Sequence, residues 1–293
     1  MQRFQFQTVP NIIAGLGTIR ELHQILQKGK YVRVLLVTDQ GMITQNLHEE
    51  VLYIINEAGL DYAIYADVQA DPPEHIIADA ISFARQEQID VVIGFGGGSS
   101  LDVAKIIAVL SHPQQTQCLN ELYGIDQVEY PRLPLILIPT TAGTGSEVTP
   151  ISIVTTGETT KTGIVSPLLF ADIAILDASF TRGLPKHITA ATGIDAMVHA
   201  IEAYTSKIKK NPYSDMLAKQ ALKLLNNNLT RVLDDGDDLE ARQNMLVGSM
   251  LAGQAFANAP VGAVHALAYP LGGHFHLSHG HSNAIVLTEV LKF

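Results

Sequence analysis

The chain contains a single cysteine, Cys118, among 293 residues. One thiol cannot form an internal disulfide and cannot supply a cysteine-rich zinc site. The chain also lacks any run of about 20 consecutive apolar residues, so we expect no helix that spans a membrane. Its first residues hold no apolar stretch long enough for a secretory signal peptide. These absences predict a reduced, soluble protein of the cytoplasm.

Basic residues are scarce as well. The chain has 19 Lys and Arg against 29 Asp and Glu, a formal net charge of −10. A chain this acidic, with no basic run, is poorly suited to bind a phosphate backbone, and we expect no nucleic-acid partner. Hydrophobic residues make up 47% of the chain, which is enough apolar material for a sizeable core. The composition therefore predicts a globular protein.

Residues up to about 180 alternate between two hydrophobic periods. Short β-branched runs, typical of buried strands, are separated by amphipathic segments with apolar residues at helical spacing. This alternation predicts a mainly parallel sheet covered by helices. The expected strands are Val32–Val37, Ile89–Ile93, Leu135–Ile138 and Ile173–Leu176, and the expected helices are Ile19–Gln27, Leu47–Ala58 and Glu74–Gln88.

After the turn Thr181-Arg182-Gly183-Leu184-Pro185 the strand pattern fades and helical segments follow. We therefore expect an α/β domain over residues 1–184 and an all-helical domain over residues 185–293. Clefts between such domains are common cofactor sites. The expected helices of the second domain are Thr189–Ser206, Ser214–Leu225, Leu239–Asn258 and Gly262–Leu271.

A glycine-rich turn, Gly94-Phe95-Gly96-Gly97-Gly98-Ser99-Ser100, follows the expected strand Ile89–Ile93 and opens a helix. Glycines let a backbone approach a ligand closely, and a helix start directs free N–H groups at an anion such as a pyrophosphate. The alternative is an ordinary tight strand–helix connection. The fingerprint G-x-G-x-x-G is not met, because Ser99 takes its third glycine position. Asp102 lies in the first turn of the new helix.

Two further features point to a nucleotide. Asp39 ends the first expected strand, where a carboxylate can accept hydrogen bonds from an adenosine ribose and repel a 2′-phosphate. The segment Pro139–Glu147 is rich in hydroxyls and glycine, which suits a phosphate or a nicotinamide ribose, although alone it would be only a polar loop. Both turns follow expected parallel strands, and ligands of open α/β sheets bind at that edge.

A carboxylate and a histidine, Asp195 and His199, lie one turn apart in an expected helix. Alone, they would be interpreted as a structural pair. We expect a break in the helix at Gly272-Gly273, which would fold His265 and a later histidine toward one point. Asp195, His199, His265 and one later histidine would then form a sulfur-free set suited to Fe²⁺ or Zn²⁺. Residues 265–281 hold five of the chain's 11 histidines, namely His265, His274, His276, His279 and His281.

Four ordered segments, which together span essentially the whole chain, resemble the iron-containing (group III) alcohol dehydrogenase family. The resemblance implies a dehydroquinate-synthase-like fold, with an N-terminal nucleotide-binding domain and a C-terminal helical metal domain. The segments are Gly96–Asp102, Pro139–Glu147, Gly193–Glu202 and Val264–Gly272, the last continuing to His279-Gly280 and Asn283-Ala284.

The resemblance also implies site residues by position. The metal ligands would be Asp195, His199, His265 and His279. Family members are commonly dimers or larger, often through an N-terminal strand that Arg3–Val9 can supply. The NAD-binding residues would be Asp39, Gly97, Gly98, Ser99, Asp102, Thr140, Thr141 and Thr144, with Lys161 near the nicotinamide.

Two departures from the family pattern matter. Many members carry a proton-relay histidine one turn after the third ligand, where this chain has Tyr269, whose phenol is a poor base at neutral pH. Relatives also continue well beyond the length of this chain. Since its later helices are apolar on more than one face, we expect part of that surface to be uncovered or covered by a partner. The apolar residues concerned are Met245, Leu246, Met250, Leu251, Phe256, Leu267 and Leu271.

The predicted function is reversible hydride transfer between NAD(H) and a small alcohol or aldehyde, with Fe²⁺ or Zn²⁺ polarising the substrate oxygen. The proton would leave through water and Tyr269 or His276. One alternative is a related enzyme, such as a hydroxyacid–oxoacid transhydrogenase, a glycerol dehydrogenase or a maleylacetate reductase. The other is a truncated, non-catalytic nucleotide-binding protein.

Overall fold

The computed structural model describes residues 3–157, 160–275 and 277–293, and the chain forms two compact units. The sheet unit comprises Val9–Thr140 and Pro150–Phe180. The helical unit comprises residues 3–8, Thr141–Thr149 and Thr181–Phe293. The polar turn Thr141–Thr149 therefore belongs to the helical unit, whereas a single domain boundary at residue 185 would assign it to the α/β domain.

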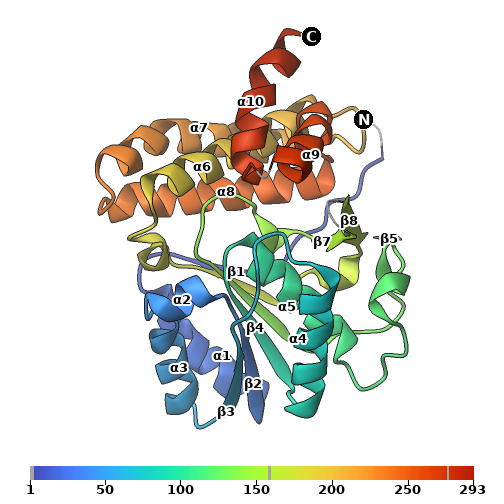
Figure 1. Ribbon diagram of the computed structural model, residues 1–293. Coiled ribbons are helices and arrows are strands. Elements are labelled where there is room, and N and C mark those ends of the chain that lie inside the picture. The colour runs from blue at the N-terminus through green and yellow to red at the C-terminus, as the bar shows by residue number, and fades with distance from the viewer. Residues whose placement is uncertain (1–2, 158–159, 276) are drawn as a thin grey trace. The chain divides into compact units, whose positions relative to one another are not determined.

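The sheet unit is built on six parallel strands in the order β1-β9-β6-β4-β2-β3 (Figure 1). The sequences of the central strands are continuous apolar runs, because a parallel sheet covered by helices is buried on both faces. All six residues of β4 are buried. The strands are β1 (Asn11–Ala14), β2 (Arg33–Val37), β3 (Asp61–Tyr65), β4 (Val91–Gly96), β6 (Leu135–Pro139) and β9 (Ile173–Leu176).

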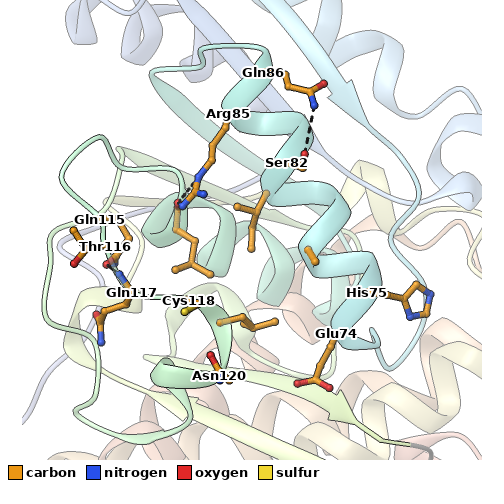
Figure 2. Close-up of a pocket in the computed structure, with 14 residues that line it drawn as sticks. Glu74, His75, Ser82, Arg85, Gln86, Gln115, Thr116, Gln117, Cys118 and Asn120 are labelled. Carbon is orange, nitrogen blue, oxygen red and sulfur yellow. Dashed lines mark hydrogen bonds between the residues drawn. The ribbon is translucent and has the colours of Figure 1, made fainter.

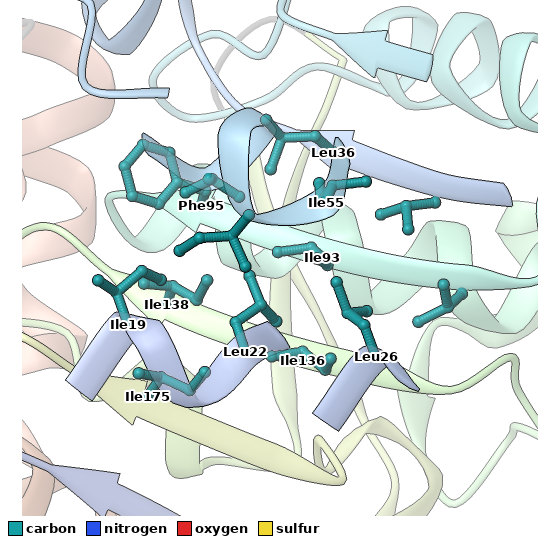
Figure 3. Close-up of a cluster of buried hydrophobic side chains, with 14 of the residues drawn as sticks. Ile19, Leu22, Leu26, Leu36, Ile55, Ile93, Phe95, Ile136, Ile138 and Ile175 are labelled. Atoms are coloured by element: carbon teal, nitrogen blue, oxygen red, sulfur yellow. The ribbon is translucent and has the colours of Figure 1, made fainter. Parts of the chain in front are cut away.

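Helices cover both faces of this sheet, with α1 and α3 on one side and α4 and α5 on the other (Figure 1). Figure 3 shows Leu22 and Leu26 of α1 packed beside Ile93 and Phe95 of β4 in the main apolar core. Such burial of branched side chains supplies most of the stabilisation of a sheet–helix layer. The helices are α1 (Glu21–Gly29), α2 (Gln40–Thr44), α3 (His48–Glu57), α4 (Glu74–Gln86) and α5 (Gly98–Leu110).

A second, three-stranded sheet also belongs to the sheet unit. Its order is β5-β8-β7, and β7 and β8 pair in antiparallel fashion. The strands are β5 (Gly124–Ile125), β7 (Ile151–Thr156) and β8 (Thr160–Val165).

The helical unit is centred on α6 (Lys186–Thr205), α7 (Pro212–Asp234) and α8 (Leu239–Asn258), which pack against one another. Their shared core is rich in alanine, such as Ala200 and Ala221, and small side chains let helices approach closely. Helix α7 starts where the sequence supplies a cap and a proline, because the Asn211 side chain accepts the N–H groups of Tyr213 and Ser214.

Two more helices, α9 (Ala263–Phe275) and α10 (His279–Lys292), complete the described chain. The expected break at Gly272-Gly273 is wrong, since α9 continues through both glycines. Glycine costs a helix only about 1 kcal/mol, which tertiary contacts readily offset. Helix α9 ends at Phe275 and α10 starts at His279, so His265 and His279 lie on separate helices.

The expectation of uncovered apolar surface is wrong for most of α8. Met245, Leu246 and Met250 are buried, because α6, α7 and the short 3-10 helix η3 (Ser146–Val148) pack around α8. Leu267 of α9 is 55% exposed, as predicted. The remaining three residues, Leu251, Phe256 and Leu271, are half-buried.

The predicted fold class, a parallel α/β unit followed by helices, is confirmed. The pattern missed β1, β3, the smaller sheet, α2 and α10, and it ended α7 too early. Arg3–Val9 pairs with no strand among the described residues, and a strand shared with a second copy stays a prediction. In the described part of the chain, no helix combines the length and apolarity needed to cross a membrane.

Candidate active site

Four side chains from three helices of the helical unit meet at one point. Asp195 and His199 come from α6, His265 from α9 and His279 from α10. Their potential metal-binding atoms all lie within 4.8 Å of one another. Asp195 Oδ1 is 3.9 Å from His265 Nε2 and 3.5 Å from His279 Nε2. The structure therefore brings together all four residues that the family resemblance implied as ligands.

A glycine allows α10 to reach this point. A Cβ atom at Gly280 would collide with the backbone carbonyl oxygen of Ala191 on α6. Asp195 lies one turn further along α6, on the same face as Ala191. Because His279 directly precedes Gly280, this close backbone contact brings its imidazole to the carboxylate of Asp195.

Burial and neighbouring charges set the protonation of His199 and Asp195. Burial lowers the pKa of His199 to about 4, and the neighbouring His265 and His279 also disfavour a positive charge there. Burial alone would raise the pKa of Asp195, but the three histidines and Asn283 lower it below its usual value. At neutral pH the site thus presents a neutral His199 and a carboxylate, the forms that bind metal. Three imidazoles and one carboxylate fit a divalent transition metal.

Two more buried polar groups touch these residues, although the sequence indicated no role for them. Glu202 Oε2 lies 2.5 Å from His265 Nδ1. Asn283 Nδ2 donates to Asp195 Oδ1 at 2.6 Å and lies 3.3 Å from Nε2 of both His265 and His279. Its buried Oδ1 has no hydrogen-bond partner among the described residues. Helical spacing could have indicated both residues from the sequence. Glu202 lies two turns beyond Asp195, and Asn283 lies one turn beyond His279, so each shares a helix face with a potential ligand.

The nucleotide candidates of the sheet unit gather where β2 and β4 end. In this sheet, β2 and β4 are neighbours. The strand that follows β2, β3, lies on one side of this pair, and β6, the next strand of the same sheet after β4, lies on the other. Open α/β sheets bind ligands at such a switch point. Asp39 follows β2 and caps α2 through Oδ1, which accepts the N–H groups of Gly41 and Met42. Its Oδ2 accepts the Ser100 hydroxyl of α5 at 3.3 Å.

The glycine turn after β4 begins α5 as predicted. Gly97 is the N-cap residue, and Gly98 is the first helical residue. Gly96 has φ +147°, and a Cβ atom there would lie 2.7 Å from Ser100 Oγ and 3.2 Å from Asp39 Oδ2. A residue with a side chain is therefore disfavoured at this corner. The free N–H groups at the start of α5 make an anion site.

Thr140 and Lys161 are also positioned within the sheet unit. Thr140 is fully buried, and its Oγ1 has no hydrogen-bond partner among the described residues. Lys161 Nζ forms an ion pair with Asp71 at 2.7 Å, and the Asp71 N–H donates to Ser99 Oγ at 3.3 Å. Asp71, which the sequence did not indicate, thus connects Lys161 to the start of α5.

Asp102 is engaged inside the sheet unit. Its carboxylate accepts the Ile153 N–H at 3.0 Å and the Lys105 ammonium at 3.3 Å. Lys105 Nζ is fully buried and also donates to the Ile151 carbonyl at 2.6 Å. These bonds give Asp102 a structural task, holding β7 against α5.

The remaining loop residues, Thr141 and Thr144, belong to the helical unit. Thr144 Oγ1 accepts the Ser146 N–H at 3.2 Å at the start of η3. In the same loop, the Gly143 carbonyl oxygen lies 3.3 Å from His199 Nδ1. A hydrogen bond donated by that nitrogen leaves Nε2 of His199 as the basic atom.

The two predicted proton-relay residues have different outcomes. Tyr269 stacks on His279 with ring centroids 5.7 Å apart and meets His265 edge-on at 6.4 Å. His276 lies outside the described residues. The structure therefore brings Tyr269 to the cluster, and a relay role for either residue stays a prediction.

A groove of about 910 Å³ in the sheet unit lies along α4 and residues 115–120 (Figure 2). Glu74, Arg85 and Cys118 are among its lining residues, and none of the predicted site residues is. The Cys118 thiol donates to Glu121 Oε2 at 2.9 Å, and this hydrogen bond raises the pKa of Cys118. A thiol held protonated is a poor nucleophile, so this groove is not a candidate active site.

Comparison with known proteins assigns the chain to a family named for its iron, which fits the cluster of potential metal ligands. Residues 10–178 match the family model described as iron-containing alcohol dehydrogenase, and residues 189–293 match the C-terminal model of the same family. The chain is 44% identical over 280 residues to long-chain-alcohol dehydrogenase 1 of Geobacillus thermodenitrificans, covering 95% of this chain and 70% of that protein.

Two other proteins extend this comparison. The NAD-dependent methanol dehydrogenase of Bacillus methanolicus is 36% identical over 97% of this chain and 74% of its own length. A crystal structure of a 1,3-propanediol oxidoreductase superposes with a TM-score of 0.95 at 36% identity, covering 99% of this chain and 76% of that one.

These matches define the class of the protein. The chain belongs to the iron-containing alcohol dehydrogenase family. It is accordingly an enzyme, an oxidoreductase of alcohols and aldehydes.

Proposed function

We propose that this protein interconverts a small alcohol and its aldehyde with NAD(H), using a divalent metal held by Asp195, His199, His265 and His279. The observation that carries the proposal is the convergence of those four donor groups within 4.8 Å on helices α6, α9 and α10. A bound Fe²⁺, or Zn²⁺ in its place, would supply Lewis acidity toward the substrate oxygen.

The chain's own residues would bind and orient the cofactor. The free N–H groups at Gly98 and Ser99, at the start of α5, would bind the pyrophosphate, and Asp39 Oδ2, which accepts the Ser100 hydroxyl, would accept ribose hydroxyls. NAD would carry the hydride. Gly97, Thr140, Thr141, Thr144 and Lys161 complete the proposed cofactor set, and Asp102 contributes by holding α5 in place.

Tyr269 is the proposed proton-relay residue among those described, because its ring stacks on His279. Its phenol can donate a hydrogen bond to water beside the cluster, while water itself removes the proton at neutral pH. His276 remains the other proposed relay residue.

The proposal extends to the setting in which the enzyme works. Its exposed free thiol, Cys118, suits the reducing cytoplasm. Exposed apolar side chains on α9 and α10, including Leu267 and Ile285, suit a homodimer or larger homo-oligomer.

The test is metal analysis of the purified protein followed by NADH formation with alcohols of increasing length. Relatives named for methanol and for long-chain alcohols set the span of that panel. We expect about one divalent metal per chain and NADH formation with at least one alcohol. His265→Ala should remove most of the metal and activity, because it deletes a buried ligand, while NAD still binds.

Retention of full metal occupancy in His265→Ala would overturn the ligand set. NADH formation by metal-free wild-type protein would overturn the role of the metal. Binding of NAD without NADH formation from any alcohol of the panel, in the metal-loaded protein, would overturn the proposed substrate class.

A further inference from the structure

Glu202 is a buried carboxylate at the metal cluster that the proposed reaction leaves without a role. It lies on the same face of α6 as Asp195 and His199, and it is only 5% exposed. Its Oε2 is 2.5 Å from His265 Nδ1, and its Oε1 accepts the Val264 N–H at 2.7 Å. Both oxygens are thus bound to α9, the helix that carries His265.

This contact determines how His265 carries its proton. A carboxylate is only an acceptor, so the hydrogen bond requires the proton to be on Nδ1. Nε2 then keeps its lone pair, and Nε2 is the nitrogen that lies 3.9 Å from Asp195 Oδ1. A ligating histidine whose other nitrogen is bound to a carboxylate is fixed in orientation and made more basic.

Charge gives a second and independent argument. Three neutral imidazoles and Asp195 would leave a bound divalent cation with one uncompensated positive charge in a buried site. An uncompensated charge is costly to bury. Glu202 supplies the second negative charge, so that two carboxylates match one divalent ion.

The other histidines lack such a partner. Nδ1 of His199 lies 3.3 Å from the uncharged Gly143 carbonyl. The side chain of His279 is 36% exposed, so water can accept a hydrogen bond from its other ring nitrogen. Among these three described histidines, His265 alone has a carboxylate other than Asp195 within hydrogen-bond distance.

We propose that Glu202 is a positioning residue of the metal centre, which holds His265 with Nε2 toward a divalent transition metal and supplies the second negative charge that the ion requires. The inference rests on the proposed metal site. It assigns no contact between Glu202 and the substrate.

The first measurement needs no substitution. In ¹⁵N-histidine-labelled wild-type protein without metal, the ¹⁵N and ¹H shifts should identify His265 as the tautomer with its proton on Nδ1. They should also show a low-field proton typical of a strong hydrogen bond. A His265 ring that carries a proton on Nε2 and none on Nδ1 would overturn the inference.

The second measurement compares Zn²⁺ dissociation constants, obtained by chelator competition, of wild type and Glu202→Gln. Glutamine keeps the shape and removes the charge, and we expect binding about 10- to 100-fold weaker. Glu240→Gln is the control, because Glu240 is an exposed carboxylate on α8 of the same unit, and we expect a change below about twofold. Far-UV circular dichroism reports whether each variant is folded.

The third measurement separates positioning from general loss of structure. If Glu202 acts partly through His265, then Glu202→Gln in a His265→Ala background should weaken Zn²⁺ binding by a smaller factor than in the wild-type background, since coupled residues are not additive and only the loss of the negative charge remains. A full additive loss would overturn the inference, and so would unchanged affinity of Glu202→Gln. Wild-type protein that binds no divalent metal would instead overturn the proposed function itself.

Discussion

At the scale of single residues, Asp39 has two tasks on its two oxygens. Oδ1 caps α2, and Oδ2 lies beside the start of α5, where the proposed pyrophosphate site begins. A carboxylate in this position repels the 2′-phosphate that distinguishes NADP from NAD, so wild-type protein should prefer NAD.

Replacing Asp39 by Gly or Asn should raise the ratio of NADP to NAD use by about tenfold or more, which corresponds to about 1.4 kcal/mol of relieved repulsion. Stability should fall by only a few tenths of a kcal/mol, because Gly and Asn both serve as N-caps. The measurement is kcat/KM for each cofactor. Asp61→Asn is the control. Asp61 is the first residue of the neighbouring parallel strand β3, so it lies at the amino ends of the strands, whereas Asp39 follows the carboxyl end of β2. Wild-type preference for NADP would contradict the placement of the ribose.

At the scale of elements, the cluster depends on how α10 meets α6. No local feature of either helix brings His279 to Asp195, and the contact exists because Gly280 lets the two backbones touch at Ala191. The helix α9 contributes similarly, since its residues 264 and 265 are both bound by Glu202. The ligand set is therefore a property of helix packing.

Gly280→Ala should weaken divalent-metal binding by at least about tenfold, because its methyl group must push the start of α10 away from α6. The unfolding free energy of the metal-free protein should drop by about 1–3 kcal/mol, the usual cost of overpacking. Chelator competition and denaturant unfolding measure the two effects. Gly272→Ala is the matched control, because a Cβ there meets nothing closer than 3.5 Å. Equal metal affinity in both variants would show that this contact does not position His279.

At the scale of the whole molecule, apolar side chains remain exposed on the last two helices. Leu267 and Phe275 of α9 are 55% and 67% exposed, and Ile285 and Leu291 of α10 are 49% and 58% exposed. The two helices contact each other (Figure 1). Large exposed apolar patches tend to cause association.

We therefore expect the purified chain to associate with increasing concentration, and Leu267→Glu with Ile285→Glu to reduce that association at least severalfold. Sedimentation or light scattering over a concentration series measures it. Tyr53→Glu, on the exposed part of α3 in the sheet unit, is the control, because Tyr53 is 64% exposed and lies on another unit. A monomer at every concentration, or an unchanged assembly in the double variant, would contradict this interpretation.

The sequence by itself was sufficient to predict the fold class and several local features of the site. The alternating strand and helix periods gave the parallel sheet, and the glycine turn correctly marked the start of α5. The spacing of Asp195 and His199 placed them on one face of a helix. Each of these features depends on residues close together in the chain, where periodicity and spacing determine the geometry. The resemblance to a family then singled out His279, which spacing alone had left open among the later histidines.

Only the tertiary structure decided how the distant parts of the site meet. Glu202 reaches His265 across 63 residues, and Asn283 reaches Asp195 across 88. The same applies to the continuation of α9 through Gly272-Gly273, where packing offsets the low helix propensity of glycine. Such contacts depend on which helices pack together and how closely, because side chains far apart in the sequence interact only after folding brings their helices into contact.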